Sequence, residues 1–164
     1  MYIVDPSQQI ELIREMTQIR KDMENWMVYY HHPYTNQMWK SFFPKATGKD
    51  RGPKLLRHEP LQDDLREYLM VCLKEDVPEN AIGAGIEQSA RMEKWPEIIQ
   101  ALEKDYTHYV RSQLKLFLKH MKVEKFRENA RELNLDLSEF SLSEKELKNL
   151  SWRSKKLKLK RIFR

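Results

Sequence analysis

The stretch Trp95–Met121, WPEIIQALEKDYTHYVRSQLKLFLKHM, is the longest helical pattern in this chain of 164 residues. Its apolar residues recur at steps of three and four, first over 98–109 and then over 110–121, which is the spacing of one helix face. Pro96 stands where a first helical residue is expected, because proline already has a helical φ. We therefore predict a central helix over this stretch, packed against more than one neighbouring element.

A second pattern lies at the start of the chain. Asp5 and Pro6 are typical of the cap and the first residue of a helix. Apolar residues then follow at alternating steps of four and three: Leu12, Met16, Ile19, Met23, Trp26 and Tyr30. This heptad-like spacing predicts a helix over residues 6–30 that packs on the central helix. A homodimer formed through helix 6–30 is the alternative.

Shorter helical signals fill most of the remaining chain. Residues 61–73, 78–91 and 126–134 each show helical spacing, and Ser143 with Glu146 has the spacing of a capping box. Gly83 and Gly85 in the segment 78–91 indicate close approach of another helix, since glycine otherwise costs about 1 kcal/mol in a helix.

These signals together predict an all-α fold. We expect a single-domain irregular helical bundle of about five to six helices, with stacked helix pairs as a variant of the same layout. The predicted domain covers residues 1–150 and includes an irregular connection over 31–60, and residues 151–164 follow as a basic C-terminal tail.

The connection 31–60 interrupts the helical periodicity with prolines and glycines. Its first part is aromatic and its second part is basic, and long connections in compact domains are more often functional than short ones. Aromatic residues, Met and Arg are enriched at the cores of protein interfaces. We predict partner binding through loop 29–58, by Tyr34, Trp39, Phe42, Phe43, Lys49, Arg51, Lys54 and Arg57. In the alternative, Trp39, Phe42 and Phe43 fold back onto the helical domain.

Charge is divided unevenly along the chain. The net charge of +5 combines +5 in residues 31–58 and +8 in residues 148–164 with −8 in the remainder. Such a distribution concerns partners rather than fold. For the tail we weigh a solvated end, a contact with an acidic protein surface, and a contact with nucleic-acid phosphates. The nucleic-acid contact would use Lys155, Lys156, Lys158, Lys160, Arg161 and Arg164.

No pattern in the sequence indicates a metal site or a cofactor. His31 and His32 are adjacent and lack a helix-borne His-Glu-x-x-His motif. Glu59, Asp63 and Glu67 share a helical spacing, but acids at a helix start are usually solvated. We therefore expect no cofactor and no metal ion.

The sequence also offers little for catalysis. Arg51 and His58 have a spacing used by some all-helical ribonucleases, but Gly52 and Pro53 lie between them. We expect no catalytic residue and keep a small metal-independent ribonuclease as a remote hypothesis.

The predicted function follows from interface composition. Cys72 is the only cysteine and lies among apolar residues, and no signal peptide or long apolar run is evident, so we expect a cytoplasmic protein without membrane insertion. We predict a non-catalytic protein-binding module of the inhibitor, immunity or adaptor type, whose partner presents an acidic surface. The alternative is an RNA- or DNA-binding protein that uses the loop and the tail as one basic face.

Overall fold

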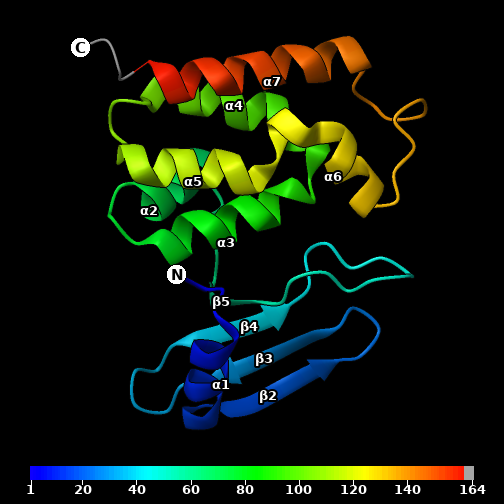
Figure 1. Cartoon of the computed structure of the whole chain (residues 1–164). Coiled ribbons are helices and arrows are strands. Elements are labelled where there is room, and N and C mark those ends of the chain that lie inside the picture. The colour runs from blue at the N-terminus through cyan, green and yellow to red at the C-terminus, as the bar shows by residue number, and fades with distance from the viewer. Residues whose placement is uncertain (161–164) are drawn as a thin grey trace.

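The computed structural model describes residues 1–160 and overturns the all-α prediction. The first 59 residues form a five-stranded antiparallel sheet with one helix, and further helices follow, so the chain has an α/β fold rather than a helical bundle (Figure 1). The strands are β1 (Tyr2–Ile3), β2 (Thr17–Asp22), β3 (Met27–His31), β4 (Met38–Phe42) and β5 (Leu55–Glu59). The helices are α1 (Pro6–Glu15), α2 (Leu65–Leu73), α3 (Pro78–Ser89), α4 (Trp95–Asp105), α5 (Arg111–Met121), α6 (Phe126–Glu132) and α7 (Glu144–Leu159).

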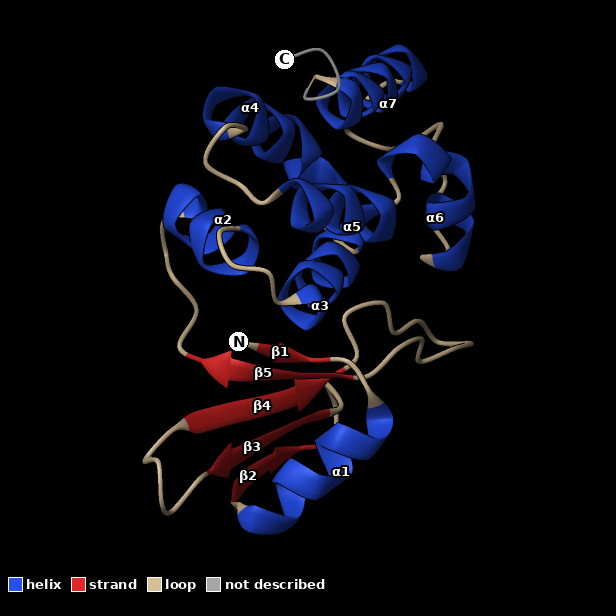
Figure 2. Ribbon diagram, turned by 60° about the vertical axis from the view of Figure 1, so that its left-hand side comes forward, coloured by secondary structure: helices blue, strands red, loops and turns tan. Residues whose placement is uncertain are grey.

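The sheet has the order β1-β5-β4-β3-β2, with antiparallel neighbours throughout. Helix α1 connects the two edge strands and lies against one face of the sheet (Figure 2). On that face Tyr30, Trp39 and Leu56 form a small core with Leu12 and Met16 from the α1 segment. The sheet therefore has its own apolar core, separate from that of the helices.

The predicted helix over residues 6–30 is wrong beyond Glu15. Asp5 and Pro6 begin α1 as expected, with the Asp5 side chain accepting a hydrogen bond from the Gln8 backbone N–H at 2.9 Å. The chain then turns extended at Met16 and forms the β2–β3 hairpin. The apolar residues of segment 6–30 have a helical spacing only by coincidence. Leu12 and Met16 face the sheet, and Tyr30 is buried on β3. Ile19, Met23 and Trp26 are exposed, so these residues do not form one apolar face. The helix that was expected to form a homodimer interface over residues 6–30 is therefore absent from the described structure.

The predicted irregular connection over 31–60 is also corrected. It contains β4 and β5, which pair with each other, so the true connection between them covers only residues 43–54. Trp39 and Phe42 belong to different cores, Trp39 on the α1 side and Phe42 on the side of the helices. Side chains of β4 alternate between the two faces of the sheet, and both faces are covered. The sequence does not show this as an apolar pattern, because Lys40 and Ser41 lie between the apolar residues of the strand.

Helices α2 to α7 form a second part of the molecule, which meets the sheet mainly through α3, the helix nearest to β1 and β5 (Figures 1 and 2). The predicted central helix is two helices, α4 and α5, which are separated by residues 106–110. At the break Val110 has an extended backbone, and its N–H donates to the Leu73 carbonyl at 2.9 Å. Tyr109 is buried there, which explains why the apolar spacing continues across a turn.

A polar cluster at the interface ties the sheet to the helices. Arg57 of β5 donates to Glu87 of α3 at 2.5 Å and to Glu59 at 2.6 Å, and both Arg57 and Glu87 are buried. The Tyr2 hydroxyl donates to the second Glu87 oxygen at 2.7 Å. Burial opposes the charge of Arg57, but the adjacent Glu87 carboxylate raises the pKa of the guanidinium overall. Arg57 is therefore held in its charged form at the interface between sheet and helices.

Gly85 lies where another helix approaches closely, as predicted, whereas Gly83 is approached by a strand residue. A Cβ on Gly85 would lie 2.6 Å from the Phe117 carbonyl oxygen of α5, and one on Gly83 would lie 2.5 Å from Cβ of Tyr2. Real Cβ atoms do not come this near. The neighbour of Gly83 is thus a strand residue, and only Gly85 meets a helix.

Gly85→Ala is expected to lower the free energy of unfolding by about 1–2 kcal/mol. A backbone oxygen cannot rotate away from the new methyl group, so we place the overpacking cost in the upper part of the usual range, at about 2–3 kcal/mol. The gain in helix propensity, about 1 kcal/mol, offsets part of this cost. Urea denaturation followed by circular dichroism measures the change. Gly48→Ala is the control, because nothing lies within 4 Å of a Cβ at this position. Equal stability of the two variants would contradict the close packing of α3 on α5.

The last helix begins at the predicted capping box. The Ser143 hydroxyl accepts from the Glu146 backbone N–H, and the Glu146 carboxylate accepts from the Ser143 backbone N–H at 2.7 Å. Residues 151–159 of the expected tail continue α7, while Arg161 and Arg164 lie outside the described residues. Over residues 1–160, no helix is both long and apolar enough to cross a membrane.

Candidate protein-binding cleft

The structure gathers three of the eight predicted partner-binding residues at one cleft. Phe43, Arg51 and Lys54 line it together, all from the connection 43–54. Lys49 is exposed in the same connection, and Tyr34 is 90% exposed in the β3–β4 loop at the opposite end of the sheet. Trp39, Phe42 and Arg57 are buried within the sheet and its interface with the helices.

This hairpin cleft has a volume of about 360 Å³ and lies where the β2–β3 turn meets the connection 43–54. Its apolar lining comes from Met23, Trp26, Met27, Val28, Tyr30 and Phe43, and its polar lining from Lys21, Asp22, Ser41, Arg51 and Lys54. The cleft therefore combines an apolar interior with three cations and one carboxylate.

Turn chemistry places Trp26 at the cleft. The Asp22 carboxylate accepts from the backbone N–H of Asn25 at 3.1 Å and from its side chain at 2.9 Å, which closes the β2–β3 turn. These hydrogen bonds lower the pKa of Asp22. Trp26 follows with a positive φ of 56° and is 42% exposed. The guanidinium carbon of Arg51 lies 3.6 Å from the centre of the Trp26 ring, so a cation–π contact joins the turn to the connection.

The connection 43–54 is held from both sides. Buried Lys45 donates to Asn129 Oδ1 at 2.7 Å and to the Glu132 carboxylate, both on α6. The Gln9 side chain of α1 donates to the Lys54 carbonyl at 3.0 Å. Burial lowers the pKa of Lys45, partly offset by Glu132. The connection is therefore a fixed loop that presents Arg51 to the hairpin.

Cations at the cleft remain available to a partner. Lys21, Arg51 and Lys54 form no ion pair with any carboxylate of residues 1–160. Met23 and Trp26 beside them are exposed, Met23 to 62%. An exposed aromatic and apolar lining with unpaired cations suits an apolar side chain flanked by acidic groups.

Met23 and Trp26 are the exposed apolar residues of the cleft that the sequence prediction did not name. The helical spacing of residues 6–30 assigned them to a helix face, although Asp22 and Asn25 carry the turn chemistry that would have placed them at a hairpin tip. The aromatic and basic composition selected Arg51 and Lys54, which lie in a hydrophilic connection at the surface.

Arg51 and His58, the pair considered for ribonuclease activity, contact different residues. His58 packs on Trp39 with ring centroids 5.4 Å apart, and burial lowers its pKa, whereas Arg51 contacts Trp26 in the exposed connection. Within the described part of the chain, no three His, Cys, Asp or Glu side chains form a group that could hold a metal ion.

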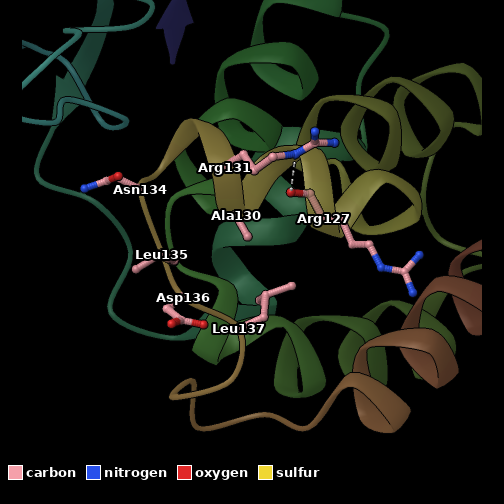
Figure 3. A pocket seen from close by; sticks show the side chains of 7 residues that line it. All are labelled: Arg127, Ala130, Arg131, Asn134, Leu135, Asp136 and Leu137. Carbon is pink, nitrogen blue, oxygen red and sulfur yellow. Dashed lines mark hydrogen bonds between the residues drawn. The ribbon is translucent and has the colours of Figure 1, made fainter.

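A larger depression of about 750 Å³ lies on α6 and the loop after it (Figure 3). Its side chains diverge: the guanidinium of Arg127 points away from the depression toward Glu144, while Asn134 and Leu135 point to the other side. Asp136 accepts hydrogen bonds from the backbone and hydroxyl of Ser138, so its carboxylate is already used. The polar groups that line this depression therefore do not converge on a common point.

The basic residues near the C-terminus lie far from the hairpin cleft. Lys155, Lys156, Lys158 and Lys160 are on or directly after α7, which lies at the opposite end of the molecule from the sheet, with other helices in between (Figures 1 and 2). The loop and the tail therefore do not form one continuous basic face within residues 1–160.

Comparison with known proteins adds no relative. No family model, no curated protein and no solved structure matches the chain significantly.

Proposed function

We propose that this protein is a non-catalytic protein-binding module of the inhibitor, immunity or adaptor type. Its partner presents an apolar side chain between acidic residues and inserts it into the hairpin cleft. The observation that carries the proposal is the Arg51–Trp26 contact at a cleft whose cations pair with no carboxylate of residues 1–160. Tryptophan and arginine are the residue types most enriched among interface hot spots.

The fixed geometry of the cleft supports tight binding. Lys45 anchors the connection to α6, and Asp22 closes the hairpin turn, so few groups need to be ordered when a partner binds. Less ordering leaves more of the contact energy for affinity. Cationic rims also accelerate association with acidic partners.

The proposed location is the cytoplasm. Cys72, the only cysteine, is buried, and burial raises the pKa of its thiol to about 12. Such a thiol has little thiolate at neutral pH and takes part in neither exchange nor metal binding. This supports a protein that does not depend on an oxidising compartment.

Affinity capture from the native cell, with and without nuclease, tests the proposal, followed by calorimetry with the captured protein. We expect Trp26→Ala combined with Arg51→Glu to weaken binding at least about 30-fold, the effect of losing one hot spot. Nuclease treatment should leave the captured protein unchanged.

The matched control is Tyr34→Ala combined with Lys49→Glu. It changes one exposed aromatic and one exposed cation outside the cleft lining. Binding within about threefold of the wild type is expected for this control. If the cleft variant binds as tightly as the control, or if capture requires nucleic acid, the proposed function is wrong.

A further inference from the structure

Helix α7 presents a basic face that the proposed function does not use. Its apolar residues Leu147, Leu150 and Leu157 are buried against the other helices. The opposite side of the helix is exposed and carries Lys145, Lys148, Trp152, Lys155, Lys156 and Leu159. Trp152 is 55% exposed, which is unusual for a tryptophan on a helix with a buried face available.

Cations in the C-terminal half of α7 divide into two groups. Arg153 is paired with Glu103 at 2.7 Å, and Lys158 is paired with Glu124. Lys155, Lys156 and Lys160 form no ion pair among the described residues. Instead the ammonium of Lys156 lies 3.9 Å from the centre of the Trp152 ring, and that of Lys160 lies 4.9 Å from the centre of the Tyr106 ring.

We propose that this α7 patch, formed by Trp152, Lys155, Lys156 and Lys160 with Tyr106, binds single-stranded nucleic acid. The lysines would contact backbone phosphates, and the exposed Trp152 ring would stack on a base. Proteins that bind single strands without sequence preference combine these same two elements, a cationic path and an aromatic platform. Two more cations, Arg161 and Arg164, follow in the sequence.

A membrane surface fits this patch less well. Interfacial helices bury a broad apolar face between lipid headgroups. The broad apolar face of α7 is already used inside the protein, and only Trp152 and Leu159 remain exposed.

An acidic protein also fits less well, because lysine is depleted at the cores of protein interfaces whereas arginine is enriched. The patch has three lysines and no arginine among the described residues, in contrast to the hairpin cleft with Arg51. Lysine acts on phosphate as a compact point charge and needs no fixed fork geometry.

Fluorescence anisotropy with a labelled oligothymidine of about 20 nucleotides tests the proposal on the full chain. With three phosphate contacts, affinity should fall about 20-fold between roughly 50 and 200 mM salt. Lys155→Gln combined with Lys156→Gln should reduce the slope of log affinity against log salt by about 1.4, since each single-strand contact contributes about 0.7. Trp152→Ala should weaken binding about 5- to 150-fold at every salt concentration.

The control is Lys145→Gln combined with Lys148→Gln, which removes the same charge from the N-terminal half of α7 and should leave the slope nearly unchanged. Circular dichroism verifies that every variant is folded. Absence of binding at low salt, or equal slopes for the two lysine pairs, would overturn the proposal. So would binding to anionic phospholipid vesicles without binding to the oligonucleotide. The proposal is independent of the hairpin cleft, so Arg51→Glu should not change oligonucleotide binding.

Discussion

Replacing Glu87 with alanine is expected to lower the free energy of unfolding by about 3–5 kcal/mol, because it removes the buried carboxylate that neutralises a buried arginine. Arg57 is buried and donates to Glu87 at 2.5 Å, and its remaining carboxylate partner is Glu59. The Tyr2 hydroxyl loses its acceptor on Glu87 as well. Chemical denaturation with urea, followed by tryptophan fluorescence, measures the loss.

Two further variants separate the ion pair from a general effect of truncation. Glu97→Ala removes an exposed carboxylate 3.9 Å from Lys94 and should change stability by less than about 0.5 kcal/mol. Arg57→Met combined with Glu87→Leu should recover most of the lost stability, since apolar residues of similar size often replace a buried pair without cost. In that double variant the Tyr2 hydroxyl keeps its hydrogen bond with the Tyr68 hydroxyl at 2.8 Å, and the Glu59 carboxylate keeps its ion pair with Lys40 at 3.6 Å. If the double variant is as unstable as Glu87→Ala, the unpaired charge is not the cause.

The effect of Glu87→Ala should be global rather than local. Glu87 belongs to α3, whereas Arg57 belongs to β5 and Tyr2 to β1, so the cluster joins the two parts of the protein. The connection 43–54 leads directly into β5. Loosening β5 therefore also loosens Arg51 in the hairpin cleft, and partner binding should weaken together with stability.

Local signals in the sequence were sufficient for several helix boundaries. Pro78 begins α3, and the predicted cap Asp5 and the capping box of Ser143 with Glu146 are observed. Such signals operate within four residues and do not depend on the rest of the fold. The break after α4 was not predicted, because it has no such local signal. It is stabilised by the hydrogen bond from the Val110 N–H to the Leu73 carbonyl, and Leu73 is distant in sequence.

The sheet could not be derived from apolar spacing. Residues 17–31 form a hairpin whose outer strand is almost wholly exposed, so β2 lacks the alternation that identifies a half-buried strand. The apolar residues of this hairpin continue the helical spacing of α1 by coincidence, which led to the incorrect helix over residues 6–30. Long-range strand pairing, such as that of β1 with β5, leaves no signal in a single sequence.

Amino-acid composition selected residues in the region of the candidate site, but it could not tell which of them are exposed and which are buried. It selected Arg51 and Trp39 for the same reason, although Arg51 is exposed at the cleft and Trp39 is buried under α1. Burial on a strand depends on which face meets another element, and that depends on the sheet. Trp26 was missed for the converse reason, because an incorrect helix placed it in a core.

Trp95→Ala is the second variant with a large expected effect, a loss of about 3–5 kcal/mol in the free energy of unfolding. Trp95 has no exposed surface and is the largest fully buried side chain of the described residues. Its ring N–H donates to the Gln88 carbonyl at 2.9 Å, so the first residue of α4 is fixed to the end of α3. Alanine would remove both the ring volume and the hydrogen bond.

Trp95→Phe and Trp152→Ala divide this effect into its parts. Phenylalanine keeps most of the ring but removes the hydrogen bond, whose net contribution is about 0.5–1.5 kcal/mol, and a smaller ring adds a modest cavity cost. Trp152→Ala removes an equally large but exposed side chain and should change stability by less than about 0.5 kcal/mol. Comparable losses for Trp95→Ala and Trp152→Ala would contradict the assignment of one tryptophan to the core and the other to a binding surface. The expected contrast would leave the Trp152 ring free of a structural role, as the proposed stacking on a base requires.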